Sequence, residues 1–186
     1  MTYFTVQTKQ SAPENSKALL QTAQDAYGFI PNLSAIQSQS PALLEGYMTL
    51  AEIFNKTDLN ETERQIILMT NNRLNGCEYC MAAHTSISQM AGVAEDVIEA
   101  LRAGSPIADA KLEALRVFAV RVNELRGWLD PSHLEELFAA GYTPQTALEV
   151  ILGTSLKVMS NYTNHIADTP LDAAFRANAW SADGTV

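Results

Sequence analysis

Apolar residues recur at helical spacing along almost the whole chain, and no segment shows the alternation typical of a strand. Leu19, Leu20, Ala23 and Ala26 predict a first helix that ends near Gly28. Further helix starts are predicted at Ser40-Pro41, at Asn60 (with Glu63 as its capping-box partner), at Cys77, near Glu95 and Leu112, at Asp130-Pro131 and at Thr143-Pro144. The chain is therefore expected to be all-α.

The last predicted helix differs from the others, because it is apolar on nearly every side. Five of its six residues from 147 to 152 are apolar: Ala147, Leu148, Val150, Ile151 and Leu152. A helix that is hydrophobic all round needs cover on every side. We therefore expect this helix in the core or in an interface between subunits, and we expect the chain to form a homo-oligomer.

The predicted helices are joined by short connections, and no Pro/Gly/Ser-rich linker divides the chain. The sequence thus predicts one domain over residues 1–186. Residues 1–55 are expected to form an N-terminal helical extension, and residues 56–186 to form a core that contains both cysteines.

Charge and hydropathy limit the possible partners and locations. The 186-residue chain has a formal net charge of −9, and its few lysines and arginines are scattered. Such a chain lacks the basic face that nucleic acid or an anionic membrane surface requires. It also has no apolar run of membrane-spanning length and no recognisable signal peptide at Met1–Gln7, so we expect a cytoplasmic protein.

The candidate chemistry lies at the start of one helix. Cys77, Cys80 and His84 stand at positions i, i+3 and i+7 and so share one helix face. A helix N-terminus or a nearby imidazole lowers the pKa of a cysteine and makes it reactive. The helix dipole favours Cys77 as the attacking thiolate, whereas the imidazole favours Cys80, and spacing alone does not decide between them.

Two other interpretations of the cysteine pair stay open at this point. The pair could be structural or accidental, since a short Cys-x-x-Cys loop adds little to the stability of a domain of this size. It could also bind zinc, with His84 and either His133 or His165 completing four ligands. The chain has no second Cys-x-x-Cys motif, which makes zinc the weaker interpretation.

The cysteine motif also carries a family resemblance. The stretch from Leu59 to His84, with the core Asn75-Gly76-Cys77-Glu78-Tyr79-Cys80, resembles the carboxymuconolactone decarboxylase superfamily. Within it, the similarity is to the alkyl hydroperoxidase D (AhpD)-like branch and its peroxidase-related members. Three other segments are similar too: Gly28–Asn32, the helix from Ser40, and Asn161–Ala167 with Thr169–Asp172.

The resemblance implies an all-helical AhpD-like bundle that assembles as a trimer or hexamer. It also implies a thiol-dependent peroxidase with a redox-active Cys77–Cys80 disulfide, in which a hydroperoxide is the substrate and a dithiol reductant or adaptor is the partner. By position, Cys80 would be the peroxidatic cysteine, Cys77 the resolving cysteine and His84 the proton relay. No metal and no organic cofactor would be needed.

Two positions depart from the pattern of the active hydroperoxidases. Gln65 stands where they carry a glutamate, and a glutamine can orient His84 but cannot carry a proton. Tyr79 replaces a histidine that some active members have. A redox sensor that switches between dithiol and disulfide without turnover is therefore the alternative function, and a metal-binding module is a third.

Overall fold

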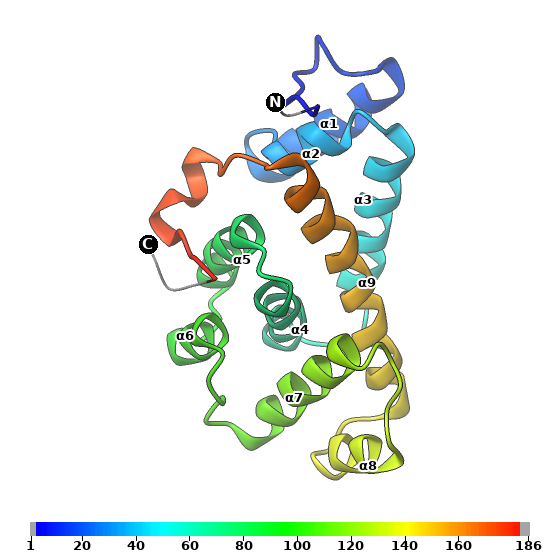
Figure 1. The fold of residues 1–186 in the computed structure, drawn as a ribbon, viewed down its shortest axis with the longest axis vertical. Coiled ribbons are helices and arrows are strands. Elements are labelled where there is room, and N and C mark those ends of the chain that lie inside the picture. The colour runs from blue at the N-terminus through cyan, green and yellow to red at the C-terminus, as the bar shows by residue number, and fades with distance from the viewer. Residues whose placement is uncertain (1–2, 183–186) are drawn as a thin grey trace.

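The computed structural model describes residues 3–182, and every regular element in that range is a helix. Figure 1 shows one all-α domain. The outermost residues of the predicted domain, 1–2 and 183–186, lie outside the described residues. The elements are α1 (Glu14–Tyr27), α2 (Asn32–Gln37), α3 (Pro41–Asn55), α4 (Glu61–Leu74), α5 (Glu78–Met90), α6 (Glu95–Ala103), α7 (Ala110–Glu124), α8 (Pro131–Ala139), α9 (Pro144–Ala167) and the 3-10 helix η1 (Ala173–Asn178).

Helix α4 is the centre of the molecule, packed against α5, α7 and α9 (Figure 1). Its residues from Gln65 to Asn72 are all buried. The main apolar core surrounds this helix, and its largest completely buried members include Phe54, Ile66, Ile67, Met69, Met81, Ile98, Leu101 and Leu115. The polar residues of α4 are consequently held between other helices, where they can take part in a site.

Three of the predicted helix starts are confirmed by side-chain caps. Asn60 accepts a hydrogen bond from the Glu63 amide at 3.0 Å, and Glu63 Oε2 accepts one from the Asn60 amide at 3.0 Å. Ser40 and Thr143 accept comparable bonds before α3 and α9. Asp130 does not cap α8 with its side chain, although the helix begins at Pro131 as predicted.

The turn between α4 and α5 positions the cysteine motif. Gly76 has a φ of 65°, a left-handed conformation that glycine adopts without strain, and it lets the chain reverse within two residues. The Cys77 amide then donates to the Asn72 carbonyl at 2.9 Å. Cys77 is the N-cap of α5, so the predicted helix start at this residue is confirmed.

Helix α9 is less evenly buried than the sequence suggests. Its inner face includes Val150, Gly153, Leu156 and Lys157, all buried. Its outer face exposes apolar side chains instead, with Leu148 and Ile166 exposed by 68% and 70%. No helix among residues 3–182 is long and apolar enough to span a membrane.

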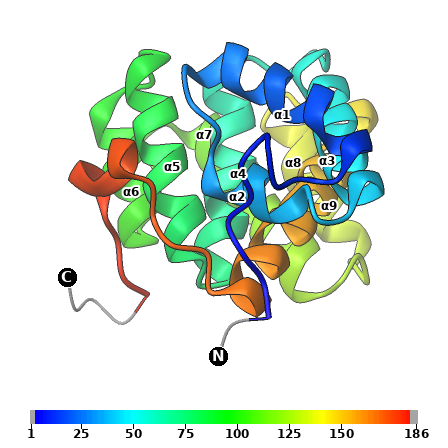
Figure 2. The same cartoon turned by 90° about the horizontal axis from the view of Figure 1, so that it is seen from above.

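Two short elements complete the architecture and were not expected from the apolar pattern. Helix α2 packs on α9, and η1 packs on α5. Figure 2 shows the C-terminal segment, in orange to red, running past α5 after it leaves α9. The start of α5 is therefore enclosed by segments from both ends of the chain.

Candidate functional site

The two cysteines are free thiols at the first turn of α5. Both are buried, with 1% of Cys77 and 2% of Cys80 exposed. Asn164, near the end of α9, donates from Nδ2 to Cys80 Sγ at 3.1 Å and lies 3.7 Å from Cys77 Sγ. A single amide donor therefore contacts both sulfurs and favours negative charge on the nearer one.

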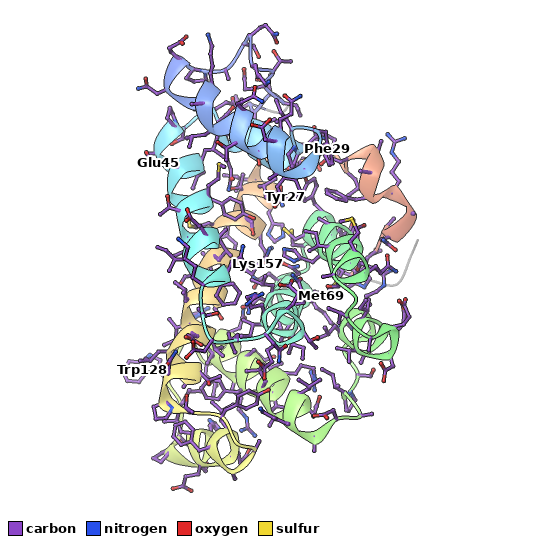
Figure 3. All side chains as sticks on the ribbon, turned by 180° about the vertical axis from the view of Figure 1, so that it is seen from behind. Tyr27, Phe29, Glu45, Met69, Trp128 and Lys157 are labelled. Carbon is purple, nitrogen blue, oxygen red and sulfur yellow. The ribbon has the colours of Figure 1, made fainter. Side chains whose placement is uncertain are left out.

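A lysine is buried beside the thiols. Lys157 of α9 is 1% exposed, and its Nζ lies 3.0 Å from Nε2 of His84. Figure 3 shows it in the interior, between the ribbon of α9 and those of α4 and α5. Within residues 3–182, no carboxylate forms an ion pair with it. A buried cation needs a compensating anion, and the thiols of Cys77 and Cys80 lie within electrostatic range of its charge.

The pKa values of the two thiols are shifted in opposite directions. Burial raises the pKa of Cys80, but hydrogen bonding from Cys77 and the charge of Lys157 more than reverse this and bring the pKa to about 5. The pKa of Cys77 is raised, first because its thiol donates to Cys80 and second because it is buried. Near neutral pH the pair is therefore a Cys80 thiolate and a Cys77 thiol.

His84 is held by hydrogen bonds on both ring nitrogens. Its Nδ1 lies 2.8 Å from Gln65 Oε1, and Gln65 Nε2 donates to Glu61 Oε1 at 2.7 Å. A carboxylate only accepts, so the amide must turn its oxygen toward the ring, and Nδ1 must carry the proton. His84 Nε2 is then an acceptor for Lys157. Burial first, and the charge of Lys157 second, lower the pKa of His84 well below its usual value, so the ring is neutral.

The structure thus brings together all four predicted site residues. The hydrogen bond expected between Gln65 and His84 is present. No hydrogen bond joins His84 to either sulfur within the described part of the chain; the charge beside Cys80 comes from Lys157 instead. The catalytic roles of Cys77, Cys80, His84 and Gln65 stay predictions.

The two histidines that could have completed a zinc site lie on other helices than the cysteines, His133 on α8 and His165 on α9. His165 is exposed and packs its ring against Tyr162 on the surface. Nowhere between residues 3 and 182 is a group of three or more His, Cys, Asp or Glu side chains arranged to hold a metal ion.

A cavity of about 850 Å³ opens onto Cys80, His84, Lys157 and Gln65. Its rim includes the half-exposed Tyr27 at the end of α1 (Figure 3). The walls are mostly aromatic and aliphatic, from helices α1 to α5, α9 and η1: Tyr27, Leu33, Tyr47, Met48, Phe54, Leu68, Tyr79, Ala83, Ile87, Leu156 and Phe175. Cys80, His84, Lys157 and Gln65 thus border a mostly apolar space, as in a small-molecule site.

Residues 41–120, which include the whole cysteine motif and its supporting helix, match the model of the carboxymuconolactone decarboxylase family. The chain also matches the structure of an uncharacterized peroxidase-related protein from Ralstonia eutropha JMP134, an alkylhydroperoxidase AhpD core, with 19% identity, a TM-score of 0.82 and 94% of each chain covered. The chain therefore has the AhpD-like fold, and its segment from residue 41 to residue 120 is similar to the carboxymuconolactone decarboxylase family.

Other structures with the AhpD-like fold include both a peroxidase-related protein and a debrominase. A peroxidase-related protein from Silicibacter sp. TM1040 matches with 17% identity and a TM-score of 0.78 over 90% of each chain. The debrominase Bmp8, as a cysteine-to-alanine variant in complex with 2,3,4-tribromopyrrole, matches with 21% identity and a TM-score of 0.79 over 96% of each chain. No curated protein matches the sequence. The partial family match and the shared fold indicate an enzyme without fixing its activity or substrate.

Tyr79, the second departure from the hydroperoxidase pattern of this superfamily, has a structural partner. Its hydroxyl donates to Asp172 Oδ2 at 2.5 Å, and the same carboxylate accepts from the Asn32 amide at 3.1 Å. The pKa of Tyr79 is raised, by burial first and by Asp172 second. Tyr79 therefore links α5 to α2 and to the C-terminal segment and is poorly placed to carry protons.

Sequence reasoning missed three members of this site: Lys157, Asn164 and Glu61. One signal was available for Lys157, since a lone lysine inside an apolar helix is seldom buried without a chemical reason. Glu61 stands one turn before Gln65, which is the spacing for a side-chain pair on one helix face. Nothing in the sequence places Asn164 against the sulfurs.

Proposed function

We propose that the protein is a thiol-dependent peroxidase that reduces hydroperoxides through Cys80 and Cys77. The observation that carries this proposal is the pairing of an acidic Cys80 with a protonated Cys77 at the end of an apolar cavity, beside the buried ammonium of Lys157. A thiolate is the nucleophilic form of cysteine, and its neighbour must keep its proton until it is needed.

In the proposed cycle, the Cys80 thiolate attacks the terminal oxygen of the hydroperoxide. An S–O bond forms, the O–O bond breaks, and the electron pair of that bond leaves on the alkoxide, which takes up a proton. The Cys77 sulfur then attacks the Cys80 sulfenic acid, and water leaves with the Cys77 proton as the disulfide forms. A dithiol donor reduces the disulfide and returns two protons to the site.

In this cycle His84 and Gln65 position the Lys157 ammonium. His84 offers Nε2 as the acceptor for Lys157, and Gln65 fixes the ring so that Nε2 carries no proton. Asn164 supports the negative charge on Cys80 and stays in reach of Cys77 as the sulfurs approach each other.

The test is consumption of tert-butyl hydroperoxide with dithiothreitol as reductant. The wild-type protein should turn over many times, and Cys80→Ser should not. Cys77→Ser should react once and accumulate a sulfenic acid on Cys80 that dimedone traps and mass spectrometry locates. The peroxidase mechanism is wrong if Cys80→Ser keeps the wild-type rate. A single stoichiometric oxidation of the wild-type protein, without turnover, would support the redox-sensor alternative.

A second candidate function is reductive dehalogenation of aromatic compounds. The fold is shared with a debrominase, and the cavity has aromatic walls at Tyr27, Tyr47, Phe54 and Phe175. Cys80 would take the bromine from carbon, the carbon would take a proton, and Cys77 would displace bromide to form the disulfide. Bromide release from 2,3,4-tribromopyrrole with dithiothreitol, measured beside the peroxide assay, decides which electrophile is preferred.

We further propose that the protein forms a homo-oligomer, a trimer or hexamer, through the outer face of α9. Leu148, Ile151 and Ile166 lie on that face and are about half or more exposed, at 68%, 49% and 70%. Covering them would remove apolar surface from water. Light scattering gives the mass directly, and a monomer at all concentrations would rule the assembly out.

A further inference from the structure

The peroxidase cycle needs a proton at a defined place in the cavity. The alkoxide that leaves when the O–O bond breaks is a strong base, so its departure is helped by a positioned acid. The donor must lie beside Cys80, because the leaving oxygen is bonded to the oxygen that the sulfur attacks.

The obvious candidate, His84, has no proton to give on the side that faces the lysine. Its proton is on Nδ1, committed to Gln65, and its Nε2 accepts from Lys157. Tyr79 commits its hydroxyl to Asp172. Tyr47 also lines the cavity, but burial above all raises its pKa and makes it a weaker acid than a free phenol.

Lys157 satisfies the geometric requirement. Its ammonium lines the same cavity as Cys80 and His84, is 1% exposed, and uses one donor on His84 Nε2 at 3.0 Å. An ammonium has three donors, so others are left for the thiolate and for the leaving oxygen.

We propose that Lys157 is the catalytic acid that protonates the leaving alkoxide, a role that rests on the peroxidase function proposed above. In this step Cys80 sulfur bonds to the terminal oxygen and is oxidised by two electrons. The O–O electron pair goes to the departing oxygen, which takes a proton from Lys157. The products are the Cys80 sulfenic acid, an alcohol and the neutral amine of Lys157.

The charge balance of the buried site favours this transfer. Before the reaction, the ammonium is compensated by the thiolate. Once Cys80 has become a sulfenic acid or a disulfide, that anion is gone, and an uncompensated buried ammonium is unfavourable. Reduction by a dithiol restores the Cys80 thiolate and supplies two protons, one for Cys77 and one for Lys157. The cycle therefore closes without any further proton source.

The experiment separates thiolate formation from proton donation. Single-turnover oxidation of Lys157→Met is followed with two oxidants, tert-butyl hydroperoxide and peracetic acid, at pH values where thiolate absorbance at 240 nm shows that Cys80 is fully ionised. An alkoxide needs a proton in order to leave, whereas acetate does not. Lys111→Met removes one lysine from the surface, where its side chain is 52% exposed, and serves as the matched control.

On the fully ionised plateau, Lys157→Met should react roughly 100-fold or more slowly than wild type with tert-butyl hydroperoxide and within about threefold of wild type with peracetic acid. Lys111→Met should match wild type with both oxidants. If Lys157→Met reacts at the wild-type rate with both, or loses the same factor with both, Lys157 is not the acid. A wild-type protein that neither oxidant oxidises would instead refute the peroxidase function.

Lys157→Arg is the second variant for the same assay if Lys157→Met does not fold. Arginine keeps the positive charge beside Cys80 but does not give up its proton near neutral pH. It should therefore preserve the low pKa of Cys80 and still lose rate selectively with tert-butyl hydroperoxide. An arginine variant with the wild-type rate for that oxidant would overturn the assignment.

Discussion

The close approach of α4 and α9 depends on Gly153, and substituting it should destabilise the protein. A Cβ at this position would lie 2.7 Å from Ile67 Cγ2 and 2.9 Å from Phe54 Cζ. Both side chains are completely buried, so neither can move away freely. Overpacking of this kind costs about 1–3 kcal/mol. Alanine recovers about 1 kcal/mol of helix propensity relative to glycine.

We therefore expect Gly153→Ala to lower the free energy of unfolding by about 1 kcal/mol, the balance of these two effects. For a chain of this size that corresponds to a fall of about 2–4 °C in the melting temperature. Gly46→Ala is the matched control, since it also lies inside a helix but its Cβ would meet only Met159 Cε at an ordinary 3.5 Å. The Gly46→Ala substitution should raise the free energy of unfolding by up to about 1 kcal/mol.

Urea unfolding followed by circular dichroism, at one protein concentration for all variants, measures both changes. The double variant with Ile67→Ala should lose less stability than the sum of the two single variants, because alanine removes the atom that the new Cβ meets. The packing argument is refuted if the free energy of unfolding of Gly153→Ala equals or exceeds that of Gly46→Ala. Gly153 also lies one turn before Lys157, so this substitution should disturb the contact between Lys157 and His84.

Three further predictions concern protonation in the site. Absorbance at 240 nm should show one thiol of the reduced protein titrating near pH 5, and Cys77→Ala should raise that midpoint by removing the hydrogen bond to Cys80; an unchanged midpoint would contradict the assignment. Because the folded-state pKa of Cys80 is lowered from 9.0 to about 5, the unfolded protein binds more protons between these values. The stability of the reduced protein, measured by urea unfolding, should therefore fall as the pH drops from 9 toward 5, by at most about 1.4 kcal/mol per pH unit, and Cys80→Ala should remove this slope. Finally, Gln65→Glu should lower the melting temperature by placing a second carboxylate against Glu61. The double variant Glu61→Gln with Gln65→Glu should recover the melting temperature. Equal melting temperatures for the single and the double variant would count against a direct contact between residues 61 and 65.

The long helices were predictable because their ends are marked by local chemistry. The capping box of Asn60 and Glu63, the Ser40-Pro41 start and the left-handed Gly76 each act within a few residues of sequence. Helix α2 and η1 were not predictable, since they are too short to show a helical period. A contact across most of the chain holds them together: the Asn32 amide at the start of α2 donates to Asp172 before η1.

The site was predictable only as far as it lies on one helix and its neighbour. Spacing places Cys77, Cys80 and His84 on one face of α5, and the family resemblance adds Gln65. Lys157 comes from α9, more than 70 residues further along the chain, and only the packing of α9 against α4 and α5 brings it to the sulfurs. Sequence reasoning consequently weighed only the imidazole and the helix dipole as activators of Cys80, and it did not include Lys157.

This ammonium explains how the site accommodates glutamine at position 65. With Lys157 beside Nε2, the ring of His84 needs only a neutral acceptor at Nδ1, and the amide oxygen of Gln65 provides one. A carboxylate is still present one turn earlier in α4, because Glu61 accepts a hydrogen bond from the Gln65 amide. Its pKa is held low, against the effect of burial, by the hydrogen bonds from Gln65 and Arg64, so the negative charge persists at the outer end of the chain. The connected side chains therefore run from the Glu61 carboxylate through the neutral Gln65 and His84 to the Lys157 ammonium and the Cys80 thiolate. A glutamate at position 65 would add an uncompensated negative charge to this series.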